Sequence, residues 1–201
     1  MLDVNNFLLI LSSPSGAGKT SISNLLLRDP CISRSISYTT RPKRLTEIDG
    51  QDYHFVTDQE FKEIRDNGGF IETVSMYNYF YGTSRSSIHK NLQEGRITLF
   101  NIDYKGMKNL ASLGYDVVTI FILPPSLKEL KNRITNRNED SAESIERRLS
   151  EAKEEIKNYH FYDYRIVNDN IEESVSLIQA IIKIEKLKRM NISDIIEDLC
   201  E

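Results

Sequence analysis

A run of small residues, Ser12–Thr20 (SSPSGAGKT), stands between the apolar stretch Phe7–Leu11 and an amphipathic stretch. Glycines in such a run permit positive φ angles, which lets several backbone N–H groups turn toward one anion. Lys19 adds a positive charge for the β- and γ-phosphates of a nucleotide, and the Thr20 hydroxyl suits Mg²⁺. The run therefore predicts a phosphate-binding loop. Its predicted ligand-contacting residues are Ser15, Gly16, Ala17, Gly18, Lys19, Thr20 and Ser21.

The loop departs from the usual pattern G-x-x-x-x-G-K-[ST] at one position, because Ser13 stands where the first glycine is expected. The alternative is a glycine-rich turn between a strand and a helix, with an exposed lysine. The apolar stretch before the loop and the amphipathic stretch after it favour the phosphate-binding interpretation. A phosphate loop alone fits kinases, GTPases and motor ATPases equally, so other residues must decide between them.

Three further segments carry a resemblance to a known family. They are Ser35–Arg44 (SISYTTRPKR) continued through Glu47 and Asp49-Gly50 to Asp52–Phe55, Phe70-Ile71-Glu72, and Tyr81-Gly82-Thr83. These segments resemble guanylate kinases, and the resemblance extends over about residues 7–187. It implies an enzyme that transfers the γ-phosphoryl group of MgATP to GMP, giving ADP and GDP.

The resemblance implies a binding site for the phosphate of GMP. Two arginines three residues apart, with phenol donors nearby, suit a dianionic phosphate. The residues that match the family are Arg41, Arg44, Tyr53 and Tyr81. Taken singly, the arginines could be a surface pair and the tyrosines ordinary half-buried strand residues.

Guanine recognition requires a different kind of group. Guanine presents N1–H and N2–H₂ as donors, and a carboxylate that accepts both leaves the acceptor N1 of adenine unsatisfied, so AMP is penalised. The resemblance places Glu72 and Asp103 at the base, with the hydroxyls of Ser37 and Thr83 nearby. The alternative for Glu72 is an ordinary solvated acid.

Arginines on either side of a polar stretch resemble the lid of the family. The resemblance implies that Arg137 and Arg148 meet the transferring phosphoryl group when the lid closes, and that Arg133 and Asn168 help to hold ATP, with Asn168 near the adenine. The implied catalytic residues are Lys19, Arg41, Arg137 and Arg148. The alternatives are a solvated helix face, with Arg147 paired to Glu146 and Glu151, and a helix-capping role for Asn168.

Two further positions differ from the family pattern. Asn101 replaces the first acid of a D-I-D sequence that ends at Asp103, and we expect weaker organisation of Mg²⁺ without loss of activity. Asn138 stands where the family often has glycine. Transfer from ATP to GMP needs positioning and charge neutralisation and no histidine base, since the attacking oxygen is already anionic. His54, His89 and His160 therefore receive no catalytic role.

Composition excludes several other classes. The 201 residues carry a formal net charge of −4, which argues against nucleic acid as a partner. No apolar run approaches the roughly 20 residues of a membrane-spanning helix, and the N-terminus lacks the basic region of a signal peptide. Cys31 and Cys200 are far apart in sequence, and we expect reduced thiols in a cytoplasmic protein. Whether the chain forms homo-oligomers is left open.

The order of expected elements predicts how these residues are positioned. Strands are expected at Phe7–Leu11, Ile36–Thr40, Ile97–Ile102, Val117–Leu123 and Tyr164–Val167. Helices are expected at Ser21–Arg28, Asp58–Asn67, Ser84–Gln93, Tyr104–Leu113, Ser126–Asn136, Ser144–Asn158 and Ile171–Leu187, with Leu127, Leu130 and Ile134 as one apolar stripe. The alternation predicts an α/β fold with a doubly wound parallel sheet and helices on both faces.

We expect one domain with three parts and a tail. The core comprises residues 1–36, 95–135 and 150–190. A small mixed α+β insert at 37–94 binds GMP, a mobile lid spans 136–149, and a tail follows at 191–201. The alternatives are an inactive guanylate-kinase-like module that binds proteins and a nucleoside monophosphate kinase for another base. The Lys19, Arg137 and Arg148 side chains argue against the first, and Glu72 and Asp103 against the second. No N-K-x-D motif supports a GTPase.

Overall fold

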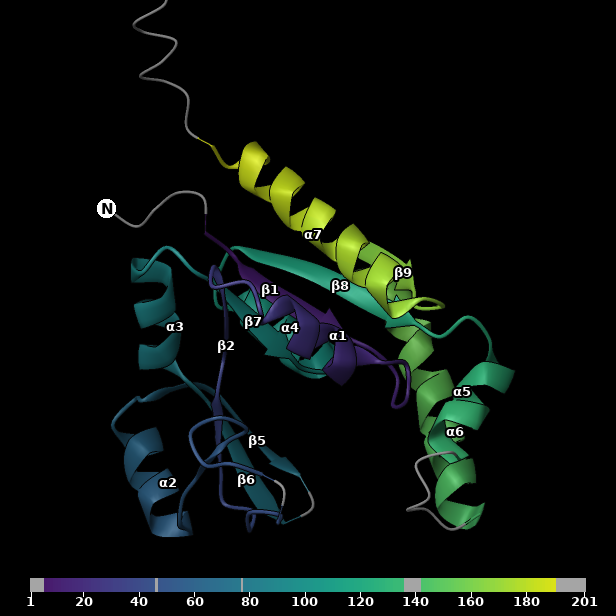
Figure 1. Cartoon of the computed structure of the whole chain (residues 1–201). Helices are drawn as coiled ribbons and strands as arrows, with labels where there is room; N and C mark the ends of the chain where they lie inside the picture. Colours follow the sequence, from purple (N-terminus) through teal and green to yellow (C-terminus); the bar gives the residue numbers. More distant parts are fainter. Residues whose placement is uncertain (1–5, 46, 77, 136–141, 191–201) are drawn as a thin grey trace, which may run out of the picture.

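The structure is a computed structural model that describes residues 6–45, 47–76, 78–135 and 142–190. Its central sheet has five parallel strands in the order β2-β7-β1-β8-β9 (Figure 1). The strands are β1 (Leu8–Ser12), β2 (Ile32–Arg34), β7 (Ile97–Asn101), β8 (Val117–Leu123) and β9 (Tyr164–Val167). The middle strand, β1, is buried along its whole length, so a continuous apolar sequence suits it.

Side chains of β1 alternate between two apolar clusters, one on each face of the sheet. Leu9 and Leu11 pack with α1 (Lys19–Leu26) and α7 (Ile171–Lys188). Leu8 and Ile10 pack on the other face with α3 (Arg85–Gln93) and α4 (Tyr104–Ser112). The phosphate loop thus follows directly on β1, a strand that is buried along its whole length and covered by helices on both faces of the sheet.

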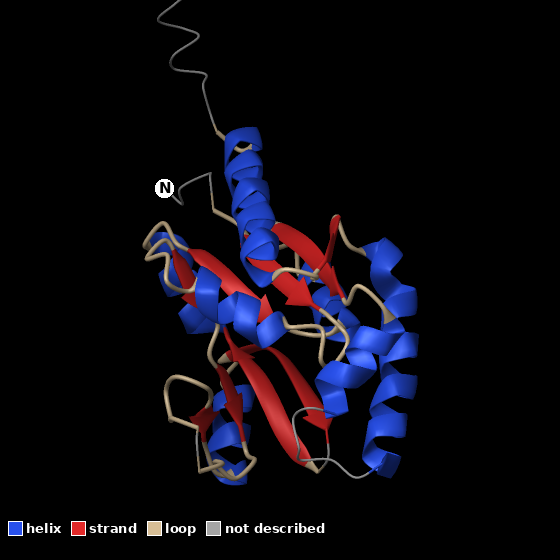
Figure 2. Ribbon diagram, turned by 45° about the vertical axis from the view of Figure 1, so that its right-hand side comes forward, coloured by secondary structure: helices blue, strands red, loops and turns tan. Residues whose placement is uncertain are grey.

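A second sheet lies below the first in Figures 1 and 2 and has the strand order β4-β3-β6-β5. Its strands are β3 (Ser37–Thr39), β4 (His54–Phe55), β5 (Phe70–Met76) and β6 (Tyr79–Ser84), and α2 (Asp58–Asp66) covers it. The ring of Phe61 on α2 is fully buried, with its centroid 4.6 Å from that of Phe70 and 5.5 Å from that of Phe80. These aromatic contacts hold the helix on the sheet.

Two helices form a separate hairpin beside both sheets: α5 (Leu127–Thr135) and α6 (Ala142–Ile156), the latter followed by the 3₁₀ helix η1 (Lys157–Phe161) (Figure 2). Leu130 and Ile134 of α5 pack against Ala152 of α6. Leu127, expected in the same stripe, is 47% exposed, because it stands at the first residue of α5, before the contact with α6 begins.

The α/β fold class and the parallel sheet covered on both faces are confirmed. Four strands were not delimited from the sequence: β2 and β4, which have only three and two residues, and the two strands of the β5–β6 hairpin. Helix α6 begins at Ala142, before the expected Ser144, and ends at Ile156. Ile88 of α3, a helix assigned to the insert, packs in the core cluster with Leu8. Among the helices described, none is long and apolar enough to cross a membrane.

Candidate active site

The phosphate loop spans the turn from β1 to α1, where Gly16 and Gly18 adopt φ angles of 91° and 99°. Gly18 is the residue before the first helical position and has no side chain with which to cap the helix. The backbone N–H groups at the start of α1 are therefore available to an anion. A hollow of about 280 Å³ lies over them, lined by Ser13, Pro14, Ser15, Gly16, Gly18, Lys19, Thr20 and Glu155. Five of the seven residues predicted to contact the nucleotide phosphates thus line this hollow, whereas Ala17 is fully buried and Ser21 is not among the lining residues.

Side chains of neighbouring elements lie close to both glycines of the loop. A Cβ atom at Gly16 would lie 2.9 Å from Ile134 of α5, and one at Gly18 would lie 2.3 Å from the amide nitrogen of Asn168. A side chain at either position is excluded by contact as well as by φ. Ser13, in contrast, does not adopt a positive φ angle. Among the described non-glycine residues, only Asn78 does. A serine in place of the motif's first glycine therefore introduces no backbone strain.

Lys19 is half-buried, and the nearby carboxylates of Glu155 on α6 and Asp103 before α4 favour its charged form. Burial lowers the pKa of Lys19, and the two carboxylates oppose that shift. Burial raises the pKa of Glu155, which Lys19 opposes, and the backbone N–H of Ser15 donates a hydrogen bond to the Glu155 carboxylate. The loop lysine and this acid therefore share one electrostatic environment.

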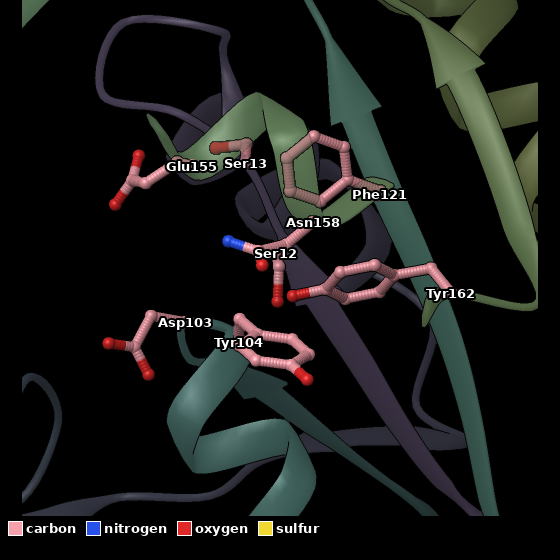
Figure 3. Close-up of a pocket in the computed structure, with 8 residues that line it drawn as sticks. All are labelled: Ser12, Ser13, Asp103, Tyr104, Phe121, Glu155, Asn158 and Tyr162. Atoms are coloured by element: carbon pink, nitrogen blue, oxygen red, sulfur yellow. The ribbon is translucent and has the colours of Figure 1, made fainter. Parts of the chain in front are cut away.

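Figure 3 shows the pocket beside the loop, with the carboxylates of Asp103 and Glu155 pointing to the same side. The rings of Phe121 and Tyr162 form its opposite wall, and burial raises the pKa of Tyr162 to about 12. The pocket is lined by Ser12, Ser13, Asp103, Tyr104, Phe121, Glu155, Asn158 and Tyr162. The pocket thus has two carboxylates on one side and two aromatic rings on the other.

Glu72 on β5 is the central acid of the second sheet. Its Oε1 accepts a hydrogen bond from Thr83 Oγ1 at 3.2 Å, and its Oε2 accepts one from Asn109 Nδ2 at 3.4 Å. Burial raises the pKa of Glu72, the two hydrogen bonds oppose the shift, and Asp103 adds to it. Ser37 lies opposite Thr83 in the register of β3 and β6. The four residues predicted at the base thus gather between the second sheet and α4.

Asp103 stands directly before α4, whose first turn it caps: Oδ1 accepts a hydrogen bond from Gly106 N at 2.9 Å. This cap fixes the carboxylate at the C-terminal end of β7, beside the phosphate loop. Asp103 influences the pKa of Lys19 on one side and of Glu72 on the other. A single acid therefore connects the phosphate loop with the second sheet.

Arg41 follows β3 and forms a bidentate ion pair with Glu47, with N–O distances of 2.8 and 2.7 Å. Its guanidinium carbon lies 5.3 Å from the ring centroid of Tyr53 and 5.5 Å from that of Phe55. The ring of Tyr81 lies 6.0 Å from that of Tyr53. Three of the four residues predicted for the GMP phosphate thus form one cluster. The fourth, Arg44, has an exposed side chain and joins the cluster through its backbone N–H to Glu47 at 2.8 Å.

The arginines near the predicted lid have different surroundings. Arg133 on α5 pairs with Glu129 at 2.9 Å and donates to the backbone oxygen of Asn168 at 3.1 Å. Arg148 is half-buried on α6, and Arg147 pairs with Glu151 at 3.8 Å, as expected for an exposed helix face. Arg137 and Asn138 lie outside the described residues, and so does Cys200.

Asn168 follows β9 and is 3% exposed. It does not cap α7, because that position belongs to Asn170, whose side chain accepts from Glu173 N. The capping alternative is therefore wrong. Asn101, the other amide of interest, accepts a hydrogen bond from Ser23 Oγ of α1 at 2.7 Å. This contact ties the end of β7 to the helix that begins at the phosphate loop.

Sequence reasoning missed three residues of the site: Glu47, Asn109 and Glu155. Glu47 was noted within the family segment but received no role. Glu155 is one of several acids on α6, and only the packing of this helix beside the loop distinguishes it from Glu154, which is exposed and pairs with Lys157. Asn109 carried no sequence signal, since its role depends on the approach of α4 to β5.

Comparison with known proteins places the chain among nucleotide kinases. The family model described as "Guanylate kinase" matches residues 5–185. A guanylate kinase of Bartonella henselae is 50% identical over 184 residues, covering 91% of this chain and 83% of that protein. One of Wolbachia pipientis is 46% identical and covers 95% of this chain and 96% of that protein. The crystal structure of guanylate kinase from Anaplasma phagocytophilum has a TM-score of 0.73 at 36% identity, over 92% and 88% of the two chains.

Proposed function

Because the chain belongs to the guanylate kinase family, we propose that the side chains described above carry out the reaction of that family in this protein. The reaction is transfer of the γ-phosphoryl group of ATP to GMP, giving ADP and GDP. The protein is thus an ATP:GMP phosphotransferase. No feature of the described residues favours the inactive binding module or a kinase for another base.

The phosphate loop is the proposed site of the donor. The backbone N–H groups from Ser15 to Thr20 hold the β-phosphate and Lys19 neutralises the β- and γ-phosphates. Thr20 is exposed at the second residue of α1, and its hydroxyl is the group of the loop that would hold Mg²⁺. When bound, the ion would supply positive charge against the charge that develops during transfer.

The Arg41 cluster is the proposed site of the acceptor phosphate. Its guanidinium is held by Glu47 and the rings of Tyr53 and Phe55 before any substrate arrives. A preorganised cation loses less entropy on binding than a free side chain. Tyr81 and Arg44 supply further donors from the same cluster.

Glu72 and Asp103 are proposed to accept the N1–H and N2–H₂ groups of guanine. Thr83 and Asn109 donate to Glu72 and so hold its carboxylate in one orientation. The Ser37 and Thr83 hydroxyls stand nearby in the paired strands. An adenine in this position would leave the carboxylates without donors, which disfavours AMP.

Arg148 and Arg137 are proposed to neutralise the transferring phosphoryl group from the lid, residues 136–149, and Arg133 and Asn168 to support ATP. The attacking oxygen of GMP is anionic, so the protein supplies position, charge and exclusion of water and no base. The expected cytoplasmic location, the lack of nucleic-acid and membrane partners and the division into core, insert and lid remain proposals on the sequence grounds given above.

The observation that carries this proposal is the position of Asp103, which lines one pocket with Ser12, Ser13 and Glu155 beside the phosphate loop. It also caps α4, the helix whose Asn109 side chain donates to Glu72 of the second sheet. Donor and acceptor sites therefore adjoin. The test is a coupled assay of ADP release with MgATP and each of GMP, AMP, CMP and UMP, with Lys19→Ala as control. We expect release that requires GMP and disappears in the control. Equal rates with AMP would overturn the base assignment, and GMP binding without turnover would favour the inactive module.

A further inference from the structure

Asn168 makes four hydrogen bonds beside the phosphate loop, two through its side-chain amide and two through its backbone. Its Nδ2 donates to the backbone oxygen of Ala17 at 2.8 Å, and its Oδ1 accepts from Ser174 Oγ of α7 at 3.1 Å. Its backbone N–H donates to Leu123 O at 2.7 Å. Its backbone oxygen accepts from Arg133 at 3.1 Å. One residue thus joins the loop to the ends of β8 and α5 and to the first turn of α7.

The orientation of this amide is fixed by its partner. The oxygen of Ala17 can only accept a hydrogen bond, so the nitrogen of Asn168 must face it. The single hydroxyl proton of Ser174 is shared between two acceptors, Asn168 Oδ1 at 3.1 Å and Asn170 O at 2.8 Å. Both ends of the Asn168 amide are therefore occupied by protein groups.

The loop fits closely around the amide. Ala17 is fully buried, and the position of a Cβ atom at Gly18 would lie 2.3 Å from Asn168 Nδ2. Between them, these two loop residues enclose the amide at the turn that directs the N–H groups toward the phosphates. Without the amide, Ala17 would retain a buried carbonyl that lacks its donor.

We propose that Asn168 is a positioning residue that holds the phosphate loop in its anion-binding conformation, with Ser174 as its support. The inference rests on the proposed function and deepens it: it assigns Asn168 to the triphosphate end of the donor, in place of the adenine contact that the family resemblance implies. Loss of the amide then weakens every ligand of the loop by the same factor, whatever base the ligand carries.

The test uses two donors and one ligand without a base. ATP and ITP differ at the exocyclic amine of the purine, and magnesium tripolyphosphate has no base at all. In Asn168→Ala we expect KM for ATP and for ITP to rise by the same factor, about tenfold for one lost buried hydrogen bond. The inhibition constant of tripolyphosphate against ATP should rise equally, and KM for GMP should stay unchanged.

Two further variants separate positioning from folding. Ser174→Ala leaves the Asn168 amide in place and removes only its support, so it should show the same pattern with a smaller factor. Asn170→Ala removes the cap of α7 without touching the loop, so it should lower the melting temperature and leave the KM for ATP unchanged. If Asn168→Ala fails to fold, the KM values of Ser174→Ala for ATP and ITP and its inhibition constant for tripolyphosphate test the proposal instead.

A loss confined to ATP, with ITP and tripolyphosphate binding as in the wild type, would overturn the proposal and restore the adenine contact. Equal donor kinetics in wild type, Asn168→Ala and Ser174→Ala would also overturn it. Failure of the proposed function looks different: the wild-type protein would then release no ADP with GMP, while tripolyphosphate binding would still report on the loop.

Discussion

Arg41 and Glu47 face each other through two N–O contacts of 2.8 and 2.7 Å, with side chains only 14% and 15% exposed. The hydrogen bond from Arg41 lowers the pKa of Glu47 to about 2, so this pair is charged at neutral pH. The cation proposed for the GMP phosphate is thus neutralised in advance by an acid of the same loop. Glu47 therefore orients Arg41 while it competes with the substrate for it.

We expect that Glu47 favours GMP binding by orienting Arg41 more than it weakens binding by competing with the GMP phosphate for Arg41. Glu47→Gln removes one charge-assisted partner of Arg41, and we predict a KM for GMP raised about tenfold with KM for ATP unchanged. Initial rates with each substrate varied in turn will measure this, with Glu63→Gln on α2 as a control for charge. A lower KM for GMP would show instead that competition dominates.

Glu72 carries the prediction for base selectivity. Glu72→Gln replaces an acceptor with a group that presents N–H to guanine, and we expect kcat/KM for GMP to fall on the order of 100-fold. Since burial raises the pKa of Glu72 above its ordinary value of 4.5, kcat/KM for GMP should fall as pH drops through that raised pKa. The variant should lose this acid limb. An unchanged pH profile would contradict the assignment.

Glu155 places a negative charge beside the loop that is proposed to bind a triphosphate. Glu155→Gln removes the repulsion and keeps a hydrogen-bond acceptor for Ser15, so we expect KM for ATP to fall about three- to tenfold. The neighbouring Glu154→Gln is the matched control, because Glu154 pairs with Lys157 on the exposed side of α6. Weaker ATP binding in Glu155→Gln would mean that the acid supports Lys19 instead.

Asn101 is predicted to limit the organisation of Mg²⁺. Asn101→Asp restores an acid at the end of β7, and we expect half-maximal activity at a Mg²⁺ concentration about two- to fivefold lower. Asn24→Asp adds the same charge to the exposed side of α1 and serves as control. The measurement is a Mg²⁺ titration at fixed ATP. An identical titration for Asn101→Asp and wild type would remove Asn101 from the metal site.

Glu185 on α7 predicts a pH dependence of stability. Burial opposes its charge, but hydrogen bonds from Lys188, Tyr164 and Arg189 outweigh burial and lower its pKa from 4.5 to about 2. A depressed pKa means that the folded state binds fewer protons than the unfolded state. The stabilisation is therefore complete above about pH 4.5 and is lost as the pH falls toward 2.

Glu185→Gln tests this dependence. We expect a melting temperature about 5 °C lower at pH 7 and a flatter decline between pH 4.5 and pH 2. Thermal unfolding by circular dichroism across that range will measure both. Glu172→Gln, on the exposed start of the same helix, controls for removal of a charge. Parallel melting curves for Glu185→Gln and wild type at every pH would contradict the prediction.

Much of the core could be predicted because its signals are local. Val117–Leu123 and Tyr164–Val167 were delimited at both ends, since apolar runs bounded by polar residues have few alternative structures. The β5–β6 hairpin was not delimited, because Glu72 and several aromatic residues interrupt the alternation that marks a strand. Its pairing depends on contact with β3 and α2, which no local pattern contains.

The site divides in the same way. The phosphate loop is one continuous segment, so its sequence carries its geometry. Glu155 and Asn168 belong to parts of the chain that are far from the loop in sequence. Their sequence positions therefore do not indicate that they lie beside the loop in the fold. Resemblance placed Asn168 near the adenine of ATP. The proposal that it positions the phosphate loop instead depends on the contacts of its amide with Ala17 and Ser174, which the sequence does not contain.

The placement of β1 at the centre of the sheet has a consequence for how the protein is made. Leu8 pairs with Thr98 of β7 on one side and with Val117 of β8 on the other. The strand that carries the phosphate loop is synthesised several seconds before both of its neighbours, at roughly 5–20 residues per second. During synthesis this apolar strand therefore has no partner in the sheet until the segment that ends with β8 has emerged.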